Sequence, residues 1–210
     1  MFGYIMVVQL VKGEIIMSVV VAVKNDNKVY IGADSQCTCN GTKICSSNIN
    51  NLKIWTVNGV DNCIIGHVGS VREANLIKTN SDYIFKDEGK IDFDYIVNCV
   101  VENIYNLLDS KKLIYKDSDD MPMMHSRFLI CYENKIYKIG KDFAVIEIDE
   151  CTALGSAELE ATGSLYSSKG EDPIVRISKA IKVAACNDIY VSDPIIIMNT
   201  YDHEVEILKI

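Results

Sequence analysis

The chain has 210 residues, of which 49% are hydrophobic and 24% are charged, with 12 glycines and 3 prolines. These values are typical of a globular protein, so they exclude disordered, collagen-like and low-complexity classes, and the length suits a single domain. The 21 Lys and Arg residues are outnumbered by 29 Asp and Glu residues, which gives a formal net charge of −8. An acidic chain without a basic run is poorly suited to binding a phosphate backbone, so we expect no nucleic-acid partner.

Eight cysteines are spread along the chain, and their surroundings indicate reduced thiols rather than disulfides or a metal centre. No pair has C-x-x-C spacing. Cys37, Cys39 and Cys45 form the one cluster that could hold a soft metal or act in redox chemistry, but it lacks a fourth ligand at finger-like spacing. We therefore predict no metal and no cofactor. The three histidines are scattered and pair with no obvious nucleophile, which leaves a His-based triad unsupported.

Residues 1–17 are predicted to form an N-terminal extension that precedes a single domain at 18–210. Residues 1–11 are mostly apolar, but no positive region precedes them, and Lys12, Gly13 and Glu14 interrupt the apolar run. This pattern matches neither a secretory signal peptide nor a membrane span. We therefore expect a cytoplasmic protein with no membrane association.

Hydrophobic patterning predicts the order strands, two helices, strands, two helices, strands. The expected strands are residues 19–23, 29–33, 53–57, 63–66, 128–131, 136–139, 195–198 and 205–210, with a polar loop at 39–51. The expected helices begin at Ser70, Phe93, Ser156 and Asp172, and the last three end near residues 112, 168 and 186. Glu73 follows Ser70 by three residues, which is the spacing of a capping box.

The first two strands, residues 19–23 and 29–33, are too continuously apolar to have one face in water, so both of their faces should be covered. Because the helices also arrive in pairs, the pattern favours the α+β class with a four-layer α-β-β-α sandwich. The helix at 93–112 is apolar over a wider arc than one buried face requires. We expect some of its side chains to lie between subunits, and the candidates are Ile96, Val100, Ile104 and Leu108.

Five blocks of sequence, in order and at compatible spacings, resemble the proteasome β-subunit family, including its HslV-type relatives. The blocks are residues 18–23 with 30–36 (SVVVAV and YIGADSQ), 53–57 (KIWTV), 64–69 (IIGHVG), 153–156 (ALGS) and 185–189 (ACNDI). The resemblance covers about residues 18–198. It implies an N-terminal nucleophile (Ntn) hydrolase, whose family fold is also the four-layer sandwich.

The resemblance implies that Ser18, as the first residue of a processed chain, attacks the scissile carbonyl and uses its own α-amine as the general base. Lys53 matches the lysine that tunes this nucleophile, and Asp34 matches the acid that holds the lysine charged and oriented. Gly66 matches the residue whose backbone N–H forms the oxyanion hole.

Ser156 and Asp188 match the outer pair that forms hydrogen bonds around the N-terminal amine. The chain departs from the family three residues after this aspartate, where a serine is usual and Val191 stands instead. Ser192 is one residue further on, and whether it substitutes is open from the sequence.

The resemblance also implies a substrate-binding surface next to the nucleophile. Cys37, Ile64 and Val68 would line the first specificity pocket, which predicts apolar side chains before the cleaved bond. Thr38 would pair its backbone with an extended peptide, as in strand addition.

A free amine at Ser18 requires that residues 1–17 be absent. The preceding residue is Met17, whereas family members often cleave themselves after a glycine. Lys12, Gly13 and Glu14 can be encoded by a purine-rich ribosome-binding sequence, so we hypothesise that translation starts at Met17, which an aminopeptidase then removes. A true propeptide and a permanently blocked, inactive chain remain alternatives.

The resemblance implies a proteasome-type endopeptidase with a serine or threonine type of mechanism. Its expected partners are peptides or unfolded proteins, other copies of the chain in a homo-oligomeric ring, and an ATP-dependent unfoldase. Two alternatives stay open, namely an Ntn-type amidase or acylase that acts on small amides, and a catalytically silent subunit that only builds a ring.

Overall fold

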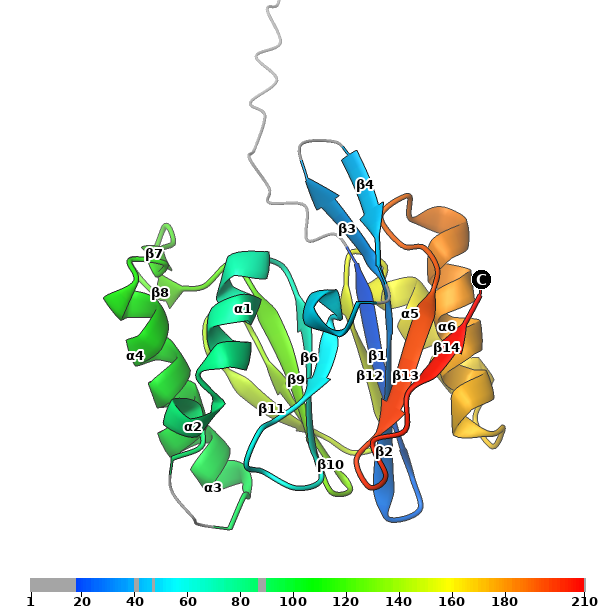
Figure 1. Cartoon of the computed structure of the whole chain (residues 1–210), viewed down its shortest axis with the longest axis horizontal. Helices are drawn as coiled ribbons and strands as arrows, with labels where there is room; N and C mark the ends of the chain where they lie inside the picture. The colour runs from blue at the N-terminus through cyan, green and yellow to red at the C-terminus, as the bar shows by residue number, and fades with distance from the viewer. Residues whose placement is uncertain (1–17, 40–41, 47, 87–89, 210) are drawn as a thin grey trace, which may run out of the picture.

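The computed structural model describes residues 18–39, 42–46, 48–86 and 90–209 (Figure 1). The expectations for residues 1–17 therefore lie outside the described residues. The described chain is a mixture of strands and helices, as the sequence predicts. None of its helices is long and apolar enough to cross a membrane, in the part of the chain that the structure describes.

Two antiparallel five-stranded sheets form the centre of the molecule. The first sheet contains β12 (Cys151–Gly155), β1 (Val19–Asn25), β2 (Lys28–Asp34), β13 (Ile195–Asn199) and β14 (Glu206–Leu208), in this order. The second sheet contains β11 (Val145–Ile148), β10 (Lys135–Ile139), β9 (Arg127–Tyr132), β6 (Cys63–Val68) and β5 (Ile54–Thr56). Two small hairpins are added to them, β3 (Gln36–Cys39) with β4 (Thr42–Cys45), and β7 (Tyr115–Lys116) with β8 (Pro122–Met123).

The helices lie on the outer sides of the two sheets (Figure 1). On the outer side of the second sheet are α1 (Val71–Thr79), α2 (Ser81–Ile84), α3 (Phe93–Tyr95), the π-helical segment η2 (Ile96–Val101) and α4 (Glu102–Ser110). On the outer side of the first sheet are α5 (Glu158–Ser167) and α6 (Pro173–Asn187). A short 3₁₀ helix, η1 (Ile49–Asn51), precedes β5.

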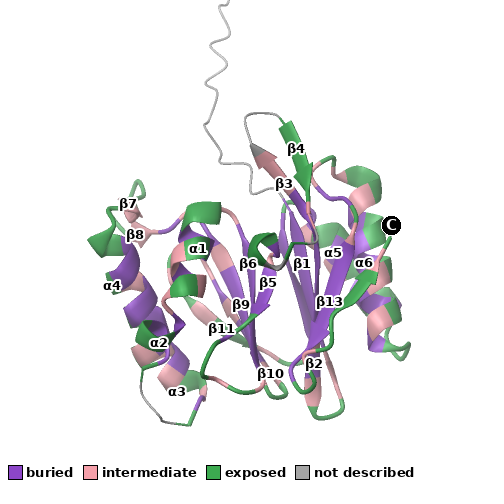
Figure 2. Ribbon diagram, in the orientation of Figure 1, coloured by how far each residue is buried: buried purple, intermediate pink, exposed green. Residues whose placement is uncertain are grey.

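Strand β1 is buried on both faces, as its apolar run predicts (Figure 2). Because side chains alternate along a strand, Val19 and Val21 face α5 and α6, whereas Val20 and Ala22 face the second sheet. The apolar contacts form three clusters, one between the second sheet and its helices, one between the two sheets, and one between the first sheet and its helices. The strand that begins at Ser18 is thus fixed from both sides.

The expectation that some apolar side chains of the helix at 93–112 lie between subunits is wrong for the residues it named. Its four candidate side chains, Ile96, Val100, Ile104 and Leu108, are all fully buried within the chain's own core. This helix packs against helices α1 and α2. Its buried side chains also share one apolar cluster with the second sheet, so the sheet and the two helices together cover its wide apolar arc.

The polar loop expected at 39–51 contains strand β4 and helix η1, and strands β11 and β12 were not anticipated. Strand β12 matters most for the site, because it pairs with β1 along its whole length, from Val19 opposite Gly155 to Val23 opposite Cys151. The first strand therefore lies between two partners, β2 and β12.

The capping box at the start of α1 is half formed. Ser70 Oγ accepts a hydrogen bond from the Glu73 N–H at 3.4 Å. The buried Glu73 carboxylate, however, accepts from the His125 N–H at 3.1 Å, and the Ser70 N–H donates to Ser126 Oγ at 3.1 Å. The start of α1 is thus bonded to the residues that lead into β9.

Candidate active site

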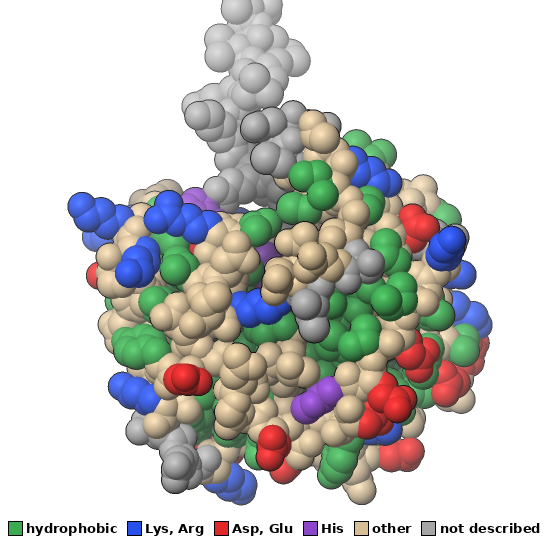
Figure 3. Space-filling model, viewed as in Figure 1, with side chains coloured by type: hydrophobic (Ala, Val, Ile, Leu, Met, Phe, Trp, Pro, Cys, Tyr) green, Lys and Arg blue, Asp and Glu red, His purple; other side chains and the backbone are tan. Residues whose placement is uncertain are grey.

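A cavity of about 560 Å³ opens where the two sheets meet the β3–β4 hairpin. Its walls include Ser18, Lys53, Cys37, Thr38, His67 and Gly69. No Asp or Glu is among the described residues that line it. On the face shown in Figure 3, most of the acidic side chains instead lie on the half that carries β13, β14 and α6. The nucleophile and the lysine predicted from the sequence therefore share one cavity.

Asp34 connects the predicted lysine to the start of β1. Its Oδ1 accepts hydrogen bonds from Lys53 Nζ at 2.7 Å and from the Val19 N–H at 2.9 Å. Its Oδ2 accepts from the Gln36 N–H at 3.0 Å. Three donors hold a carboxylate whose side chain has no exposed surface. Asp34 therefore connects the Lys53 ammonium to the N–H of Val19, the residue that follows Ser18.

The Lys53 ammonium is nearly buried, with 11% of its side chain exposed. Burial lowers the pKa of Lys53 below its ordinary value, and the charge of Asp34 opposes this shift. A buried ammonium without the carboxylate would be costly, and this explains why the two residues occur together.

Ser18 is 5% exposed and adopts a φ of 128°, a region that L-residues rarely occupy. Its carbonyl oxygen accepts a hydrogen bond from the Ser156 N–H at 3.0 Å. Gly155 lies directly against that carbonyl, because a Cβ on Gly155 would stand 1.8 Å from the Ser18 oxygen, and its φ is +124°. Only glycine fits this position, so the Gly155–Ser156 turn is shaped around Ser18.

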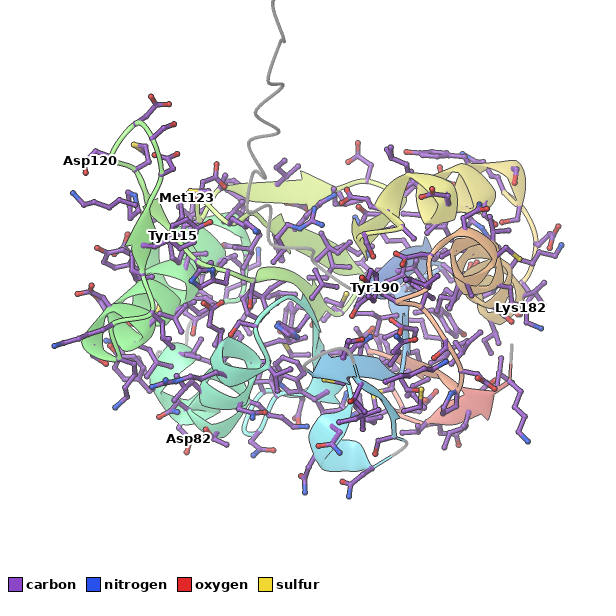
Figure 4. The ribbon with its side chains drawn as sticks, turned by 90° about the horizontal axis from the view of Figure 1, so that it is seen from above. Asp82, Tyr115, Asp120, Met123, Lys182 and Tyr190 are labelled. Carbon is purple, nitrogen blue, oxygen red and sulfur yellow. The ribbon has the colours of Figure 1, made fainter. Side chains whose placement is uncertain are left out.

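Ser156 and Asp188, predicted as the outer pair, are bonded to each other. Ser156 Oγ donates to the Asp188 carboxylate and also lies 3.4 Å from the Ser18 carbonyl oxygen. The other carboxylate oxygen of Asp188 accepts from the Tyr190 N–H at 2.8 Å. Seen from above, Tyr190 lies near the middle of the molecule, whereas Tyr115 and Met123 lie toward its left end, at β7 and β8 (Figure 4).

The Ser192 hydroxyl contacts Cys45 and not the Ser156–Asp188 pair. Its Oγ lies 3.2 Å from Cys45 Sγ, and its carbonyl accepts from the Ser35 N–H at 3.2 Å. Val191 is buried in the core beneath α6. Ser192 thus fastens β4 to the chain that follows Asp188.

The structure separates the two glycines of the Gly-x-x-Gly motif. Gly66 lies inside β6, paired with Ile54 and Leu129, where a Cβ would stand 2.7 Å from Val20 Cγ1. It is a close-packing position between the sheets and does not line the cavity. Gly69 lines the cavity with Ser18, at φ +116°, and a Cβ there would be 2.4 Å from the His125 carbonyl oxygen. The motif's second glycine, at the turn from strand to helix, was the signal that the sequence analysis passed over.

The predicted pocket residues divide in the same way. Cys37 and Thr38 line the cavity. Ile64 and Val68 instead have their side chains in the core between the two sheets and do not reach it. Because side chains alternate along β6, His67 faces the cavity where Ile64 and Val68 cannot.

His67 is a buried member of the cavity wall that the sequence analysis left without a role. It packs between Trp55 and Phe128, with ring centroids 6.4 and 5.3 Å away, and its Nε2 lies 3.2 Å from Ser126 Oγ. Burial, assisted by the positive charge of Lys53, lowers the pKa of His67 to about 3. The imidazole is therefore neutral at neutral pH and contributes a flat, uncharged surface.

Comparison with known proteins finds similarity in structure. No protein-family model matches the sequence, and no curated protein matches it. Among solved structures, Thiobacillus denitrificans BPH in complex with epoxomicin is similar over 86% of this chain and 97% of its own, with a TM-score of 0.69 and 20% identity. The structure of Thiobacillus denitrificans BPH gives a TM-score of 0.70, again with 20% identity, over 86% of this chain and 96% of its own.

Eukaryotic HslV from Trypanosoma brucei is similar over 91% of this chain and 99% of its own, with a TM-score of 0.60 and 18% identity. These neighbours match nearly their whole length, so the likeness is one of the complete domain and not of a shared motif. The resemblance to the proteasome β-subunit and HslV family that the sequence indicates is thus confirmed at the level of the fold: the chain has the fold of proteasome-type peptidases.

Proposed function

We propose that the chain is a proteasome-type endopeptidase that uses Ser18 as an N-terminal nucleophile once residues 1–17 are absent. The observation that carries this proposal is that Ser18 shares a cavity with Lys53, while Asp34 binds both Lys53 and the N–H that follows Ser18. We also interpret the two sheets and their outer helices as the four-layer α-β-β-α sandwich of Ntn hydrolases, on the basis of the three apolar clusters.

The proposed reaction takes its nucleophile and its general base from one residue, Ser18. The free α-amine of Ser18, with an ordinary pKa near ~8, takes the hydroxyl proton as Oγ attacks the carbonyl carbon of a peptide. The tetrahedral intermediate collapses, the peptide nitrogen leaves with that proton, and an ester to Ser18 remains. Water, activated by the same amine, then hydrolyses the ester and releases the acid product.

Lys53 stabilises the oxygen of Ser18 as negative charge develops on it, because a fixed ammonium in a poorly hydrated cavity acts strongly on a nearby anion. Asp34 keeps the ammonium in place through the 2.7 Å contact. Ser156 contacts the Ser18 carbonyl from the other side, and Asp188 holds the Ser156 hydroxyl, so the pair orients the amine through Ser156.

We assign the oxyanion-binding N–H to Gly69 in place of Gly66. Gly69 lines the cavity together with Ser18, and none of the described residues accepts a hydrogen bond from its N–H. Gly66, in contrast, is held inside β6 between two partner strands.

The substrate is proposed to lie along β3 as an added strand, with its backbone next to Thr38. The side chain before the cleaved bond would enter the cavity beside Cys37, Trp55 and the neutral His67. These walls are largely uncharged, so we expect an apolar residue at this position. Trp55 and His67 thus take the place that the sequence analysis gave to Ile64 and Val68.

We propose that the chain works in the cytoplasm as a homo-oligomeric ring that admits peptides or unfolded proteins, together with an ATP-dependent unfoldase. The whole-domain likeness to HslV from Trypanosoma brucei supports a ring. An Ntn-type amidase for small amides and a catalytically silent ring subunit remain the alternatives.

The proposal is tested by comparing two forms of the protein on a fluorogenic peptide that ends in an apolar residue. The chain with Ser18 as its first residue should release the fluorophore, and the chain that begins at Met1 and stays unprocessed should not, because an amide nitrogen cannot act as the base. Ser18→Ala should abolish turnover, and Ser18→Thr should keep measurable turnover. Equal activity of both forms would refute the mechanism.

Two further measurements separate the alternatives. A silent ring subunit would form the same assembly with Ser18→Ala as without it and would show no turnover in either form. An amidase would act on short acyl amides and leave longer peptides intact. N-terminal sequencing of protein expressed from the native gene shows whether Ser18 is the first residue. The nucleotide sequence that encodes Lys12, Gly13 and Glu14 tests whether translation starts at Met17.

A further inference from the structure

Arg127, Lys138 and Glu158 form a group of charges that joins the two sheets next to the proposed site; we call it the inter-sheet ion cluster. Arg127 Nη1 lies 2.7 Å from one oxygen of Glu158, and Lys138 Nζ contacts the other oxygen. The two cations belong to strands β9 and β10 of the second sheet, whereas Glu158 is the first residue of α5, on the first sheet. One carboxylate therefore binds two cations across the gap between the sheets.

The position of the cluster follows from strand alternation. Arg127 lies on the same face of β9 as Leu129, and Lys138 on the same face of β10 as Ile136. Leu129 and Ile136 are buried in the core between the sheets, so the two cations stand where this apolar core ends. About a quarter of the Glu158 side chain is exposed (26%), so the ion pairs are only partly screened by water.

The cluster is bonded directly to the turn that surrounds Ser18. Arg127 Nη2 donates to the Gly155 carbonyl at 3.1 Å, and Lys138 Nζ donates to the Ala153 carbonyl at 3.2 Å. The next N–H along the chain, that of Ser156, is the one that binds the Ser18 carbonyl. Movement of Arg127 would therefore be passed to Ser18 through one peptide unit.

The other side of the cluster reaches the opposite wall of the cavity. Arg127 pairs with Val68, the residue before Gly69. Ser126, which precedes Arg127, binds the Ser70 N–H and His67 Nε2 through its Oγ. Arg127 thus connects the strand next to Gly69 with the turn that contacts Ser18.

We infer that Glu158 and Arg127 are positioning residues for the proposed reaction: they fix the distance between the Ser18 nucleophile and the Gly69 N–H across the two sheets. This inference rests on the proposed function. The distance between two reacting groups on separate sheets is not set by neighbouring bonds of the chain. A misplacement of about 1 Å can reduce turnover roughly 100-fold. The inter-sheet ion cluster, which is bonded to the turn next to Ser18, fixes this distance.

The test compares two isosteric neutralisations in the chain that begins at Ser18, which retains every described residue. Glu158→Gln removes the charge that holds Arg127 and Lys138. Glu150→Gln is the matched control, because Glu150 also binds two cations, Lys169 at 2.6 Å and Arg176 at 3.5 Å, next to the opposite end of β12. Both variants are assayed with a fluorogenic peptide at a temperature well below unfolding.

Glu158→Gln should lower kcat by roughly tenfold or more and change KM by less than about threefold, because the pocket is intact while the reacting groups are misplaced. Arg127→Lys should recover part of the lost rate relative to Arg127→Met, since one ammonium can bind either Glu158 or the Gly155 carbonyl but not both well. Glu150→Gln should leave kcat within about twofold. Equal losses of kcat in the Glu158 and Glu150 variants, or no loss in either, would overturn the positioning role.

Hydrogen exchange supplies a readout that does not need turnover. In Glu158→Gln, the Ser156 amide should exchange at least about tenfold faster than in the unmodified chain, and in Glu150→Gln it should be unchanged. Unaltered exchange at Ser156 would contradict the inference even if the enzyme proved inactive. A chain whose turnover does not depend on Ser18 would instead contradict the proposed function, so the two failures are distinguishable.

Discussion

Asp34 binds Lys53 and the N–H of Val19 through the same oxygen, Oδ1, at 2.7 and 2.9 Å. Asp34 therefore holds the Lys53 ammonium next to the backbone of β1, at the residue that follows Ser18. In this arrangement a single carboxylate sets both the charge state of the lysine and its distance from the nucleophile. The pair is thus a part of the proposed mechanism whose contribution can be measured.

Lys53→Met should abolish turnover, because it removes the ammonium that is proposed to stabilise the developing negative charge on Ser18 Oγ while keeping most of the side chain's volume. It should also destabilise the fold, by up to about 3–5 kcal/mol, since Asp34 stays buried without its cation. Asp34→Asn should reduce turnover with a smaller loss of stability, because the amide oxygen can still accept from the Val19 N–H. Steady-state rates and urea unfolding midpoints of the two variants check this prediction.

The two Asp34 and Lys53 variants have contrasting outcomes that would count against the mechanism. A near-normal rate in Lys53→Met would remove the lysine from the reaction. A larger loss of stability in Asp34→Asn than in Lys53→Met would mean that the carboxylate's backbone hydrogen bonds, and not the ion pair, dominate the energetics of the site.

The two glycines of the Gly-x-x-Gly motif should respond differently to alanine. Gly66→Ala forces a methyl group against Val20 and Ile31, at 2.7 and 2.8 Å, and should cost about 1–3 kcal/mol of stability through overpacking. Its turnover at low temperature should nevertheless persist. Gly69→Ala combines a positive φ with a backbone clash at His125 and should abolish turnover.

Thermal unfolding and turnover of the two alanine variants, measured in parallel, check the prediction. Loss of turnover in a well-folded Gly66→Ala protein, with Gly69→Ala still active, would return the oxyanion role to Gly66.

The parts of this chain that the sequence predicts best are those whose signals are local. The continuously apolar runs at 19–23 and 29–33 predict a hairpin covered on both faces, and the structure confirms it. Ser70 and Asp172 are expected to begin helices, and the structure has them as the N-caps of α1 and α6.

What the sequence does not predict depends on contacts between distant segments. The five residues of β12 are too few to show a period, and they become a strand because β1 offers an edge to pair with. The helix at 93–112 shows a wide apolar arc, and only the packing of α1 and α2 against it explains where that arc is used. The matching block predicts Ile64 and Val68 as pocket residues, but the face on which each side chain lies depends on the register of β6.

His67 should make the fold sensitive to acid. Its pKa is about 3 in the folded chain, against an ordinary value near 6.5, so between these pH values the unfolded chain binds a proton that the folded chain does not. The stability associated with His67 is therefore complete above about pH 6.5 and decreases as the pH falls toward about 3. Between about pH 7 and pH 4.5 the loss should reach up to about 3 kcal/mol.

His67→Gln should be less stable at neutral pH, because the ring no longer packs against Phe128, yet its stability should change less with pH. Urea unfolding midpoints at about pH 7 and 4.5 measure this slope. His203→Gln, at a partly exposed position that does not line the cavity, is the control and should keep the slope of the unmodified chain. Parallel slopes in His67→Gln and the unmodified chain would show that the imidazole does not titrate as burial requires.

Assembly of the proposed ring can be measured from the mass of the particle in solution. An interior nucleophile that accepts many sequences is compatible with a cell only when subunits enclose it, and ring closure needs head-to-tail contacts between two different faces of each subunit. Ile96, Val100, Ile104 and Leu108 cannot supply such a contact, because their side chains are buried within the chain. We expect the contact to use apolar side chains that remain outside the core, such as Leu159 on α5 and Ile189 after α6, which are 85% and 80% exposed. Light scattering of the chain that begins at Ser18 should give the mass of at least about six subunits, and Leu159→Asp should reduce it while Ile146→Asp, on the edge strand β11, should not. A monomer at micromolar concentration would exclude the enclosed-protease proposal and favour an amidase that acts on small amides.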